Sequence, residues 1–296
     1  MVKNMQNIGF IGLGTMGFPM ATHICKKSGF AFTGYDISEA VSVKLNEAGG
    51  NFTTNVQDIY QNCDVICFCL PKNELTENAI QQSISLAKEN TILIDFGSTA
   101  PEIIQNLAQQ CEKKQIHLLD CPVSGGEQGA IQASLSLMCG GKKEIFDMVL
   151  PILQCVGKNV TYLGESGNGS IAKLANNMIV GGNLVAMHEA FAFAVKCGLD
   201  PQKLWEAIKE GFAQSAVLDV KIPKILNRDF TPSAKIAVHQ KDIKNAIHFA
   251  KMQNVTLPLS ELVLDQMSEM EKLQLLNEDQ CAMIKLYENH MHIVVK

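Results

Sequence analysis

The segment Gly9-Phe10-Ile11-Gly12-Leu13-Gly14-Thr15-Met16-Gly17 decides how the first part of this chain folds. Residues 8–11 have the apolar character of a buried strand, and residues 16–24 have the apolar periodicity of a helix. Between them, the first glycine permits a tight turn, the second lets backbone N–H groups approach a pyrophosphate, and the third lets the helix pack closely on the strand. The segment therefore predicts a dinucleotide cradle. The alternative is a glycine turn that only closes a strand and helix pair.

A second expected strand, residues 30–35, ends on Asp36. An acid at this spacing accepts hydrogen bonds from the adenosine ribose hydroxyls and repels a 2′-phosphate. We therefore expect NAD as the cofactor, with NADP less favoured. The cofactor-binding residues expected from this pattern are Gly12, Leu13, Gly14, Thr15, Met16, Gly17 and Asp36.

Length and charge narrow the class of protein. A chain of 296 residues is long enough for two domains, each with its own core. The formal net charge is −5 with both signs mixed throughout, so we expect neither a nucleic acid nor a membrane as a partner. Arg228 is the only arginine, which leaves lysine, hydroxyl and backbone N–H groups to bind any anion. The apolar run 178–195 carries His188 and Glu189, so we expect a buried helix there rather than a membrane span.

The ten cysteines form no C-x-x-C pair and have no histidine at ligand spacing. We therefore expect neither a metal site nor a disulfide framework, and the thiols are typical of small buried residues in a reducing compartment. The first core strand begins within a few residues of Met1, which leaves no room for a targeting peptide. These features favour a cytoplasmic protein.

Short β-branched runs alternate with helical patterns up to about residue 163, which is typical of an α/β fold with a parallel, doubly wound sheet. After Gly169 nearly every segment has a helical pattern, so we expect the second domain to be all-α. The Gly-rich segment 164–169 leads into its first and longest helix, which places the domains at residues 1–165 and 166–296. The expected strands are residues 8–11, 30–35, 64–70, 91–95, 117–119, 134–139 and 160–163, and the expected C-terminal helices are residues 171–197, 201–209, 216–226, 237–252, 260–271 and 279–289.

Two polar residues near the start of that long helix are candidates for chemistry. Lys173 and Asn177 are four residues apart, so they project from the same face of one helix. The positive end of a helix, together with desolvation, lowers the pKa of a lysine placed there, toward a group that exchanges protons near neutral pH. The alternative is a solvated surface lysine.

A glycine loop after another expected strand offers an anion site. Ser124, Gly125 and Gly126 provide a hydroxyl and successive N–H groups, which together suit a carboxylate. The alternative is a loop whose glycines only permit the turn.

Four motifs in this order resemble the β-hydroxyacid dehydrogenase family, and the resemblance covers essentially the whole chain. They are the glycine segment 9–17, Asp120-Cys121-Pro122-Val123-Ser124-Gly125-Gly126-Glu127-Gln128-Gly129-Ala130, Gly164-x-x-Gly167-x-Gly169-x-x-x-Lys173-x-x-Asn176-Asn177, and Lys241-Asp242-Ile243.

The resemblance implies a Rossmann-type N-terminal domain, an all-helical C-terminal domain joined to it by a long interdomain helix, and a catalytic site in the cleft between them. Relatives form dimers or tetramers, so the family also implies a homodimer or homotetramer. By the same resemblance Lys173 is the catalytic lysine and Asn177 orients the substrate. The residues implied to bind the substrate carboxylate are Ser124, Gly125 and Gly126, and those implied to line the cofactor are Leu70, Pro71, Thr99 and Lys241.

This sequence departs from the family at positions that concern the substrate. Ala234 stands where many relatives place a phenylalanine against the substrate, and Ala133-Ser134-Leu135 replaces the usual Gly-Thr-Leu. The segment 211–215 lacks the Ser-Ser-Gly or Gly-Arg-Ser pattern of familiar members. Its Gln214 could hydrogen-bond a polar tail but cannot neutralise a second carboxylate.

These observations predict reversible hydride transfer between NAD and a short 3-hydroxy acid. Because a methyl branch suits an apolar wall and the chain offers no arginine to bind further anionic groups, 3-hydroxyisobutyrate, oxidised to methylmalonate semialdehyde, is the expected substrate. The alternatives are tartronate semialdehyde, succinate semialdehyde and glyoxylate. A phosphogluconate-type enzyme is disfavoured by the short chain and by the lack of an arginine cluster for a phosphate. It is also disfavoured by Asn176, which stands where that type has histidine. The presence of Lys173 disfavours an imine reductase and a non-catalytic NAD-binding scaffold.

Overall fold

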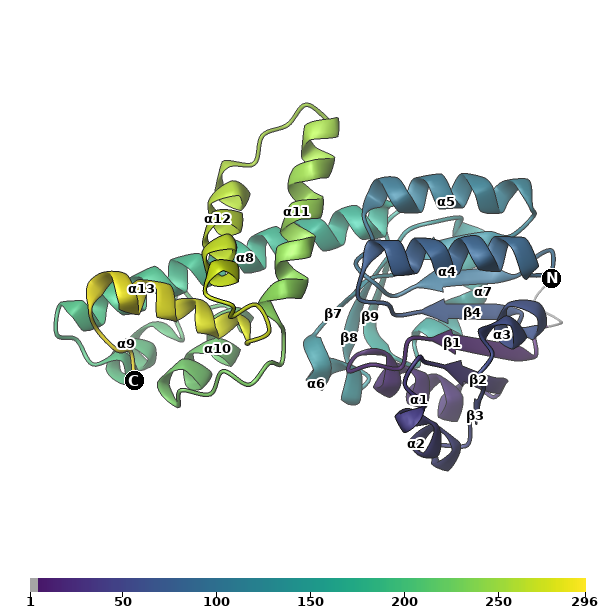
Figure 1. Cartoon of the computed structure of the whole chain (residues 1–296), viewed down its shortest axis with the longest axis horizontal. Helices are drawn as coiled ribbons and strands as arrows, with labels where there is room; N and C mark the ends of the chain where they lie inside the picture. The colour runs from purple at the N-terminus through teal and green to yellow at the C-terminus, as the bar shows by residue number, and fades with distance from the viewer. Residues whose placement is uncertain (1–4) are drawn as a thin grey trace. The chain divides into compact units, whose positions relative to one another are not determined.

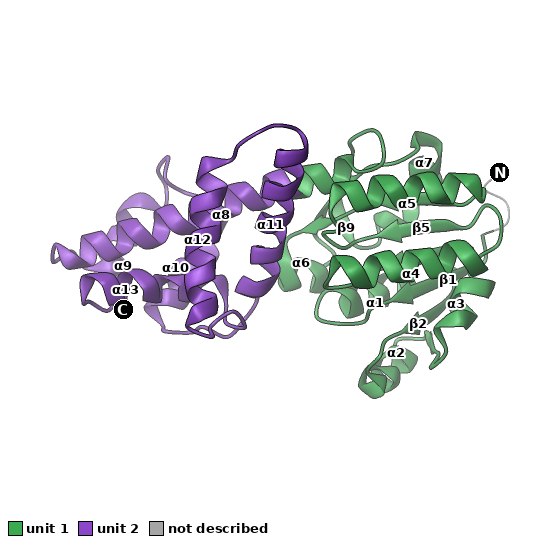
Figure 2. Cartoon of the chain, turned by 45° about the horizontal axis from the view of Figure 1, so that its top comes forward, with its two compact units in different colours: residues 1–173 green, residues 174–296 purple. Residues whose placement is uncertain are grey.

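The computed structural model describes residues 5–296 and divides between Lys173 and Leu174 into two units, which Figure 2 colours separately. Unit 1 contains residues up to 173, and unit 2 contains residues 174–296. Helix α8 (Asn168–Lys196) begins in unit 1 and continues into unit 2. The expected fold, a doubly wound sheet followed by an all-helical domain with a long helix joining them, is confirmed.

Unit 1 is built around a six-stranded parallel sheet with the strand order β3-β2-β1-β4-β5-β6 (Figure 1). The order reverses beside β1, which pairs in parallel with β2 on one side and β4 on the other. In such sheets a ligand binds beyond the carboxyl ends of the strands at the point of reversal. The strands are β1 (Asn7–Ile11), β2 (Ala31–Tyr35), β3 (Asn51–Phe52), β4 (Val65–Phe68), β5 (Ile92–Asp95) and β6 (His117–Asp120).

Helices cover both faces of this sheet. Because side chains alternate along each strand, the residues of one strand enter two different apolar clusters. Ile8 and Phe10 of β1 join one apolar cluster, which includes residues of α1 and α7. Ile11 points to the other cluster, which includes residues of α3, α4 and α5. The helices of unit 1 are α1 (Gly17–Lys27), α2 (Ser42–Glu47), α3 (Val56–Asn62), α4 (Asn73–Leu86), α5 (Pro101–Lys113), α6 (Gly126–Ile131) and α7 (Lys143–Leu153), with a 3-10 turn at Glu39–Val41.

The last strands of unit 1 form a second sheet of three strands, β7 (Val123–Ser124), β8 (Leu135–Cys139) and β9 (Gly157–Tyr162). Strand β7 runs antiparallel to β8, and β8 runs parallel to β9. The expectation that residues 134–139 and 160–163 extend the parallel sheet was therefore wrong in this detail. Only two residues separate β6 from β7, which is too short for the crossover that a parallel neighbour requires.

Unit 2 contains helices whose apolar faces share one core. Asp200 and Ser215 begin two of them, because each side chain accepts a backbone N–H of the first turn. Helix α8 is long and apolar enough to cross a membrane by length and composition, yet Leu184, Met187 and Phe191 lie in the core of unit 2. The other helices are α9 (Pro201–Ile208), α10 (Ala216–Leu226), α11 (Ile236–Met252), α12 (Pro258–Lys272), the 3-10 helix η3 (Gln280–Met283) and α13 (Ile284–Met291).

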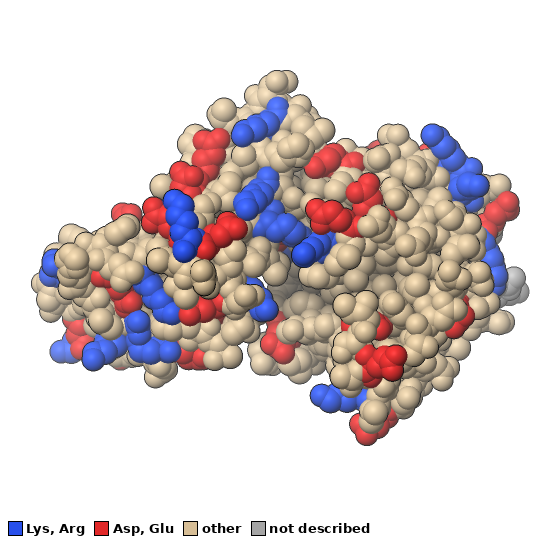
Figure 3. All heavy atoms as spheres, in the orientation of Figure 1, with Lys and Arg blue, Asp and Glu red and all other residues tan. Residues whose placement is uncertain are grey.

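Acidic and basic side chains are interspersed on the face of the molecule drawn in Figure 3. This agrees with the mixed charge pattern of the sequence, whose formal net charge is −5. Within the described residues, no group of three or more His, Cys, Asp or Glu side chains could hold a metal ion.

Candidate active site

The glycine turn after β1 has the geometry of a nucleotide cradle, and its first glycine makes the turn possible. Gly12 has a φ of +95°, which is a left-handed conformation that favours glycine. Its N–H donates to the Tyr35 carbonyl oxygen at 3.0 Å, so the turn continues the pairing of β1 with β2. A Cβ at Gly12 would lie 2.4 Å from the Cys69 carbonyl oxygen, so the loop after β4 also requires glycine here.

The other two glycines of the motif have different roles. A Cβ at Gly17 would lie 1.9 Å from the Gly12 carbonyl oxygen, so only glycine lets α1 begin this close to β1. A Cβ at Gly14 would meet no atom within 4 Å, so the space beside the second glycine is open. The first turn of α1 carries no acidic residue that would oppose an anion. These residues fit the diphosphate of a dinucleotide.

Asp36, directly after β2, is held by two backbone groups. Its Oδ2 accepts the Leu13 N–H at 2.7 Å, and its Oδ1 accepts the Ser38 N–H at 2.9 Å. The Leu13 side chain is buried in the sheet core, which fixes the position of its N–H group. The hydrogen bond from that N–H group therefore holds Asp36 beside the glycine turn. Thr15 is exposed and Met16 is half-buried at the start of α1.

The loops after β4 and β5 come together beside the same turn. A Cβ at Gly12 would lie 3.0 Å from the Leu70 side chain, and one at Gly97 would lie 3.4 Å from the Leu70 carbonyl oxygen. Pro71 follows Leu70 and is exposed. Sequence reasoning missed Asp95, which ends β5 and accepts the Thr99 hydroxyl at 2.6 Å, so that the predicted cofactor residue Thr99 is fixed by a buried carboxylate.

The predicted carboxylate loop lies at the end of β7 and the start of α6. Ser124 is half-buried and pairs with Ser136 of β8. Gly125 and Gly126 are exposed and have φ values of +135° and +62°, which side chains rarely adopt. The loop is therefore exposed at two positions whose conformation favours glycine.

A second carboxylate, Asp120, which the sequence analysis quoted in a motif without giving it a role, anchors the start of α8. Asp120 ends β6 and is fully buried, and its two oxygens accept the Gly167 N–H at 2.9 Å and the Ser170 N–H at 2.7 Å. Burial raises the pKa of Asp120 to about 6, although the two N–H groups act in the opposite direction. A Cβ at Gly169 would lie 2.3 Å from the Met138 carbonyl oxygen, so the helix start is seated tightly on unit 1.

Lys173 lies one turn beyond this anchor, on the same helix as Asn177. It is half-buried rather than fully solvated. The Asp120 carboxylate accepts two N–H groups at the start of this helix, so a negative charge lies at the positive helix end that was expected to act on Lys173. A signal for Asp95 and Asp120 was present in the sequence, since both end a strand of a parallel sheet, where ligands bind.

In unit 2, Asn177 is buried and its side-chain amide is fixed by hydrogen bonds on both sides. Its Nδ2 donates to Asp242 Oδ2 at 2.6 Å, and its Oδ1 accepts the Asn176 Nδ2 at 2.9 Å. The predicted cofactor residue Lys241 is half-buried, and its Nζ lies 3.1 Å from Asp242 Oδ1. Asp242 therefore accepts a hydrogen bond from Asn177 and forms an ion pair with Lys241, which are both predicted site residues.

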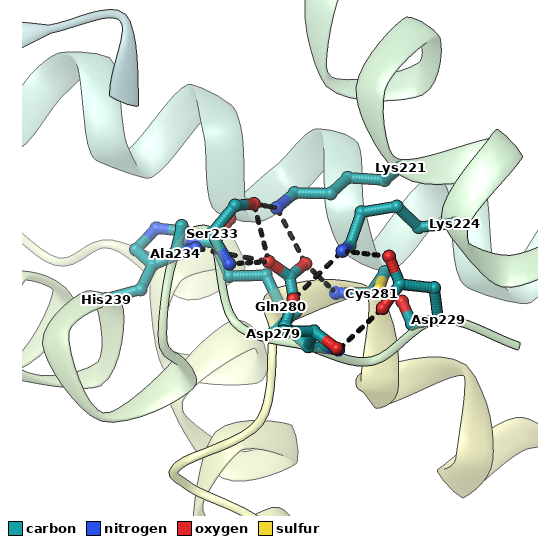
Figure 4. Close-up of polar contacts among 10 residues, drawn as sticks. Lys221, Lys224, Asp229, Ser233, Ala234, His239, Asp279, Gln280 and Cys281 are labelled. Atoms are coloured by element: carbon teal, nitrogen blue, oxygen red, sulfur yellow. Dashed lines mark hydrogen bonds and ion pairs between the residues drawn. The ribbon is translucent and has the colours of Figure 1, made fainter. Parts of the chain in front are cut away.

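Asp279 organises the loop that carries Ala234, as Figure 4 shows. Its Oδ2 accepts the N–H groups of Ser233 at 2.9 Å and Ala234 at 3.1 Å. Its Oδ1 accepts the Lys221 Nζ at 2.7 Å, in an ion pair that is almost fully buried. The paired ammonium holds the pKa of Asp279 well below its usual range, against the effect of burial.

Arg228, the single arginine of the chain, is engaged in an ion pair within unit 2. Arg228 makes a two-pronged pair with Glu288, with Nη2 at 3.0 Å from Oε2, and also donates to the Val295 carbonyl oxygen. Gln214, which was expected to reach a polar tail, is exposed and donates to Asp219 Oδ2 at 2.7 Å.

Known proteins resemble this chain along most of its length. The family described as the NAD-binding domain of 6-phosphogluconate dehydrogenase matches residues 7–164, and the family described as the NAD-binding part of NADP-dependent 3-hydroxyisobutyrate dehydrogenase matches residues 167–287. The chain is 31% identical to 2-(hydroxymethyl)glutarate dehydrogenase of Eubacterium barkeri, covering 95% of this chain and 94% of that one. It is 35% identical to 2-hydroxy-3-oxopropionate reductase of Escherichia coli, covering 86% and 87%.

A solved structure, 3-hydroxyisobutyrate dehydrogenase of Mycobacterium tuberculosis with L-serine, superposes with a TM-score of 0.87. It is 26% identical in sequence and covers 96% of this chain and 99% of its own. Both the sequence families and the curated relatives are dehydrogenases or reductases of hydroxy acids. The chain belongs to the NAD(P)-dependent β-hydroxyacid dehydrogenase family and is an oxidoreductase of that type.

Proposed function

We propose that this enzyme oxidises 3-hydroxyisobutyrate to methylmalonate semialdehyde, reversibly and with NAD. The observation that carries the proposal is the pair Lys173 and Asn177, one turn apart on α8, in a chain whose glycine turn fits a dinucleotide. Tartronate semialdehyde is the second candidate, because the Escherichia coli relative is named for that substrate and is the more similar in sequence of the two compared.

The compounds in the relatives' names share one chemical core. Hydroxymethylglutarate, 3-hydroxyisobutyrate, serine and the reduced product of tartronate semialdehyde are all 3-hydroxypropionates that differ in the substituent at carbon 2. These substituents are a propionate, a methyl, an ammonium and a hydroxyl group. The shared carboxylate and carbinol suit Ser124 to Gly126 and Lys173, so the substrate question reduces to the group that the pocket wall accepts at carbon 2.

The ion pairs of two unit 2 cations support a substrate without a second carboxylate. Arg228 is committed to Glu288, and the buried Lys221 is committed to Asp279. Burying an unpaired carboxylate costs several kcal/mol, on the order of the effects seen for unpaired buried ions. A small uncharged substituent therefore fits this chain better than a propionate, which supports the methyl of 3-hydroxyisobutyrate.

Asp36 supports NAD over NADP. A 2′-phosphate beside its carboxylate would meet like charge, and the following residues Ile37-Ser38-Glu39 offer no cation. We expect kcat/KM to favour NAD by about 100-fold, or about 2.7 kcal/mol. The double variant Asp36→Ser with Ile37→Arg should reverse or abolish this preference in steady-state assays, whereas Ile37→Arg alone should not.

The mechanism assigns the proton to Lys173. During oxidation the neutral amine of Lys173 accepts the substrate hydroxyl proton, and during reduction its ammonium donates a proton to the carbonyl oxygen. Asn177 orients the substrate through the one Nδ2 hydrogen that Asp242 does not take. Ser124, Gly125 and Gly126 bind the carboxylate, and NAD supplies the hydride chemistry when bound.

We also propose an arrangement for the whole enzyme. We place cofactor binding in residues 1–165, substrate recognition and assembly in residues 166–296, and the enzyme in the cytoplasm. Ile179 and Phe193 of α8 are 66% and 62% exposed, which supports a contact between copies in a homodimer or homotetramer. Sedimentation of the full chain tests the assembly.

A substrate panel tests the proposal. Purified enzyme is assayed with NADH and the semialdehydes whose carbon 2 carries methyl, hydroxyl or propionate, and with succinate semialdehyde and glyoxylate. We expect the highest kcat/KM for methylmalonate semialdehyde and at least about a tenfold loss for the propionate compound. A preference for tartronate semialdehyde would select the second candidate. Turnover of none would contradict both.

A further inference from the structure

We propose that His239 is a positioning residue for the reaction, and that Gln280 fixes its ring in the tautomer that holds the α8 main chain at Asn177. The inference rests on the proposed role of Asn177 in orienting the substrate. Its structural part, the tautomer and the anchor, stands on contacts within unit 2.

The contacts form a short chain of hydrogen bonds in the interior of unit 2. His239 Nε2 lies 2.8 Å from the Asn177 carbonyl oxygen, and His239 Nδ1 lies 2.9 Å from Gln280 Nε2. His239 is 3% exposed and Gln280 is 8% exposed, so water does not compete freely for either bond. The residues come from three separate elements, since Asn177 lies on α8, His239 on α11 and Gln280 on η3.

The partners determine the tautomer. A carbonyl oxygen only accepts, so Nε2 must carry the hydrogen that is donated to Asn177. In the neutral ring Nδ1 then has a lone pair, which accepts a hydrogen from the Gln280 amide. If the ring were charged, two donors would face each other at Nδ1, and the Gln280 amide would have to turn over. The geometry therefore requires neutral His239 with its hydrogen on Nε2.

The ring lies against the turn of α8 that contains Gly181. A Cβ at Gly181 would lie 3.6 Å from the ring atoms Cε1 and Nε2, an ordinary van der Waals contact, and 3.0 Å from Val263 Cγ1, so His239 packs directly on this turn. The Asn177 carbonyl is the normal acceptor for the N–H of residue 181, four residues later. His239 adds a second donor to that carbonyl, which ties α11 to one turn of α8.

The same anchor connects Asn177 to the loop that differs from the family. The Gln280 N–H donates to the Ala234 carbonyl oxygen at 3.0 Å, while its side chain holds His239. Figure 4 shows Ala234, Gln280 and His239 together beside Asp279. Asp242 fixes the Asn177 side chain and His239 fixes its main chain, so α11 determines both the place and the orientation of the amide.

The kinetic test compares two substitutions at one position. His239→Leu removes both hydrogen bonds and should lower kcat/KM about 30-fold, with the Kd for NADH unchanged within about twofold. His239→Gln keeps an amide donor that can reach the Asn177 carbonyl, and it should recover most of that loss. Gln280→Leu, which frees the ring without removing it, should fall between them. His248→Leu is the matched control, because His248 is an exposed residue of the same helix.

Two further measurements do not depend on turnover. In the wild-type enzyme with 15N-labelled histidine, NMR should show His239 with a protonated Nε2 and an unprotonated Nδ1 across neutral pH. In His239→Leu, amide hydrogen exchange should rise in residues 174–182 and remain unchanged in β1. The opposite tautomer, or a charged ring, would overturn the anchor.

The outcomes separate this inference from the proposed function. If the wild type reduces no semialdehyde while the tautomer and the exchange are as expected, the proposed function fails and the anchor stands. If His239→Leu changes exchange but has the kinetics of His248→Leu, or if His239→Gln is as impaired as His239→Leu, the positioning role is refuted.

Discussion

The two units hold helix α8 by different means. In unit 1 the Asp120 carboxylate accepts two backbone N–H groups at the helix start, and glycines allow the close approach. In unit 2 side chains from α11 hold the middle of a turn, with Asp242 on the Asn177 amide and His239 on its carbonyl. The predicted sites of unit 1 are therefore built mainly from backbone shape, whereas those of unit 2 are built from side-chain hydrogen bonds.

The largest expected effect comes from the lysine that follows the unit 1 anchor. Lys173→Ala should lower turnover about 1,000-fold, because it removes the group that exchanges the proton, while NADH binding in unit 1 remains within about twofold. Stopped-flow binding and steady-state rates measure the two quantities. Lys203→Ala, an exposed lysine of α9, is the control. Near-normal turnover of Lys173→Ala would show that the lysine beyond the unit 1 anchor does not exchange the proton.

The second prediction asks whether backbone shape alone builds the nucleotide site of unit 1. Gly17→Ala should destabilise the protein by about 3 kcal/mol, since its Cβ would lie 1.9 Å from the Gly12 carbonyl oxygen. Gly14→Ala meets no protein atom, so it should leave stability unchanged but weaken NADH binding at least about tenfold. Urea unfolding and cofactor titration separate the effects. Equal behaviour of the two variants would contradict the assigned roles.

The third prediction concerns pH, because the two units bury titratable groups with opposite effects. Burial raises the pKa of Asp120 to about 6, from 3.8 in the unfolded chain. The stability it contributes is present below pH 3.8 and is lost as pH rises through 6. His188 of α8 is fully buried, and burial, with Lys221 adding to it, lowers its pKa to about 3 from 6.5. Its contribution is present above pH 6.5 and is lost as pH falls toward 3.

Neither ring nitrogen of His188 makes a hydrogen bond among the described residues, although the main chain of Cys281 approaches the ring. Lowering the pH from about 6.5 to about 4 should therefore cost unit 2 about 3 kcal/mol of stability. In His188→Leu this loss should disappear. The single tryptophan, Trp205, lies in α9 and reports unfolding of unit 2 by fluorescence.

The same lowering of pH should raise the stability of unit 1 by about 2 kcal/mol, because Asp120 becomes protonated more readily in the folded protein. Asp120→Asn should remove that gain. Amide exchange in β6 reports the stability of unit 1. Asp64→Asn is the control, because Asp64 is half-buried and also accepts two backbone N–H groups, far along the chain from Asp120. Slopes of the same sign in both units would contradict the burial assigned to these groups.

Part of the architecture of unit 1 could be predicted from the sequence, and part could not. The glycine turn, the strand ending on Asp36 and the alternation of strands and helices could be predicted, because each depends on local conformation and on periodic burial. The departure of β8 and β9 from the main sheet could not, since it depends on how the chain pairs after β6. The roles predicted for Lys173, Asn177 and Ser124 to Gly126 remain predictions.

The amino-acid sequence by itself determined the fold class and the family of this chain. The glycine turns, the apolar periodicity and each motif depend on residues that are close together in the chain. Only the tertiary structure decided what holds the candidate residues. Asp120 meets Gly167 and Ser170 across about 50 residues, and His239 meets Asn177 and Gln280 across 62 and 41. Such bonds depend on the packing that brings distant segments together and excludes water, which no local pattern encodes.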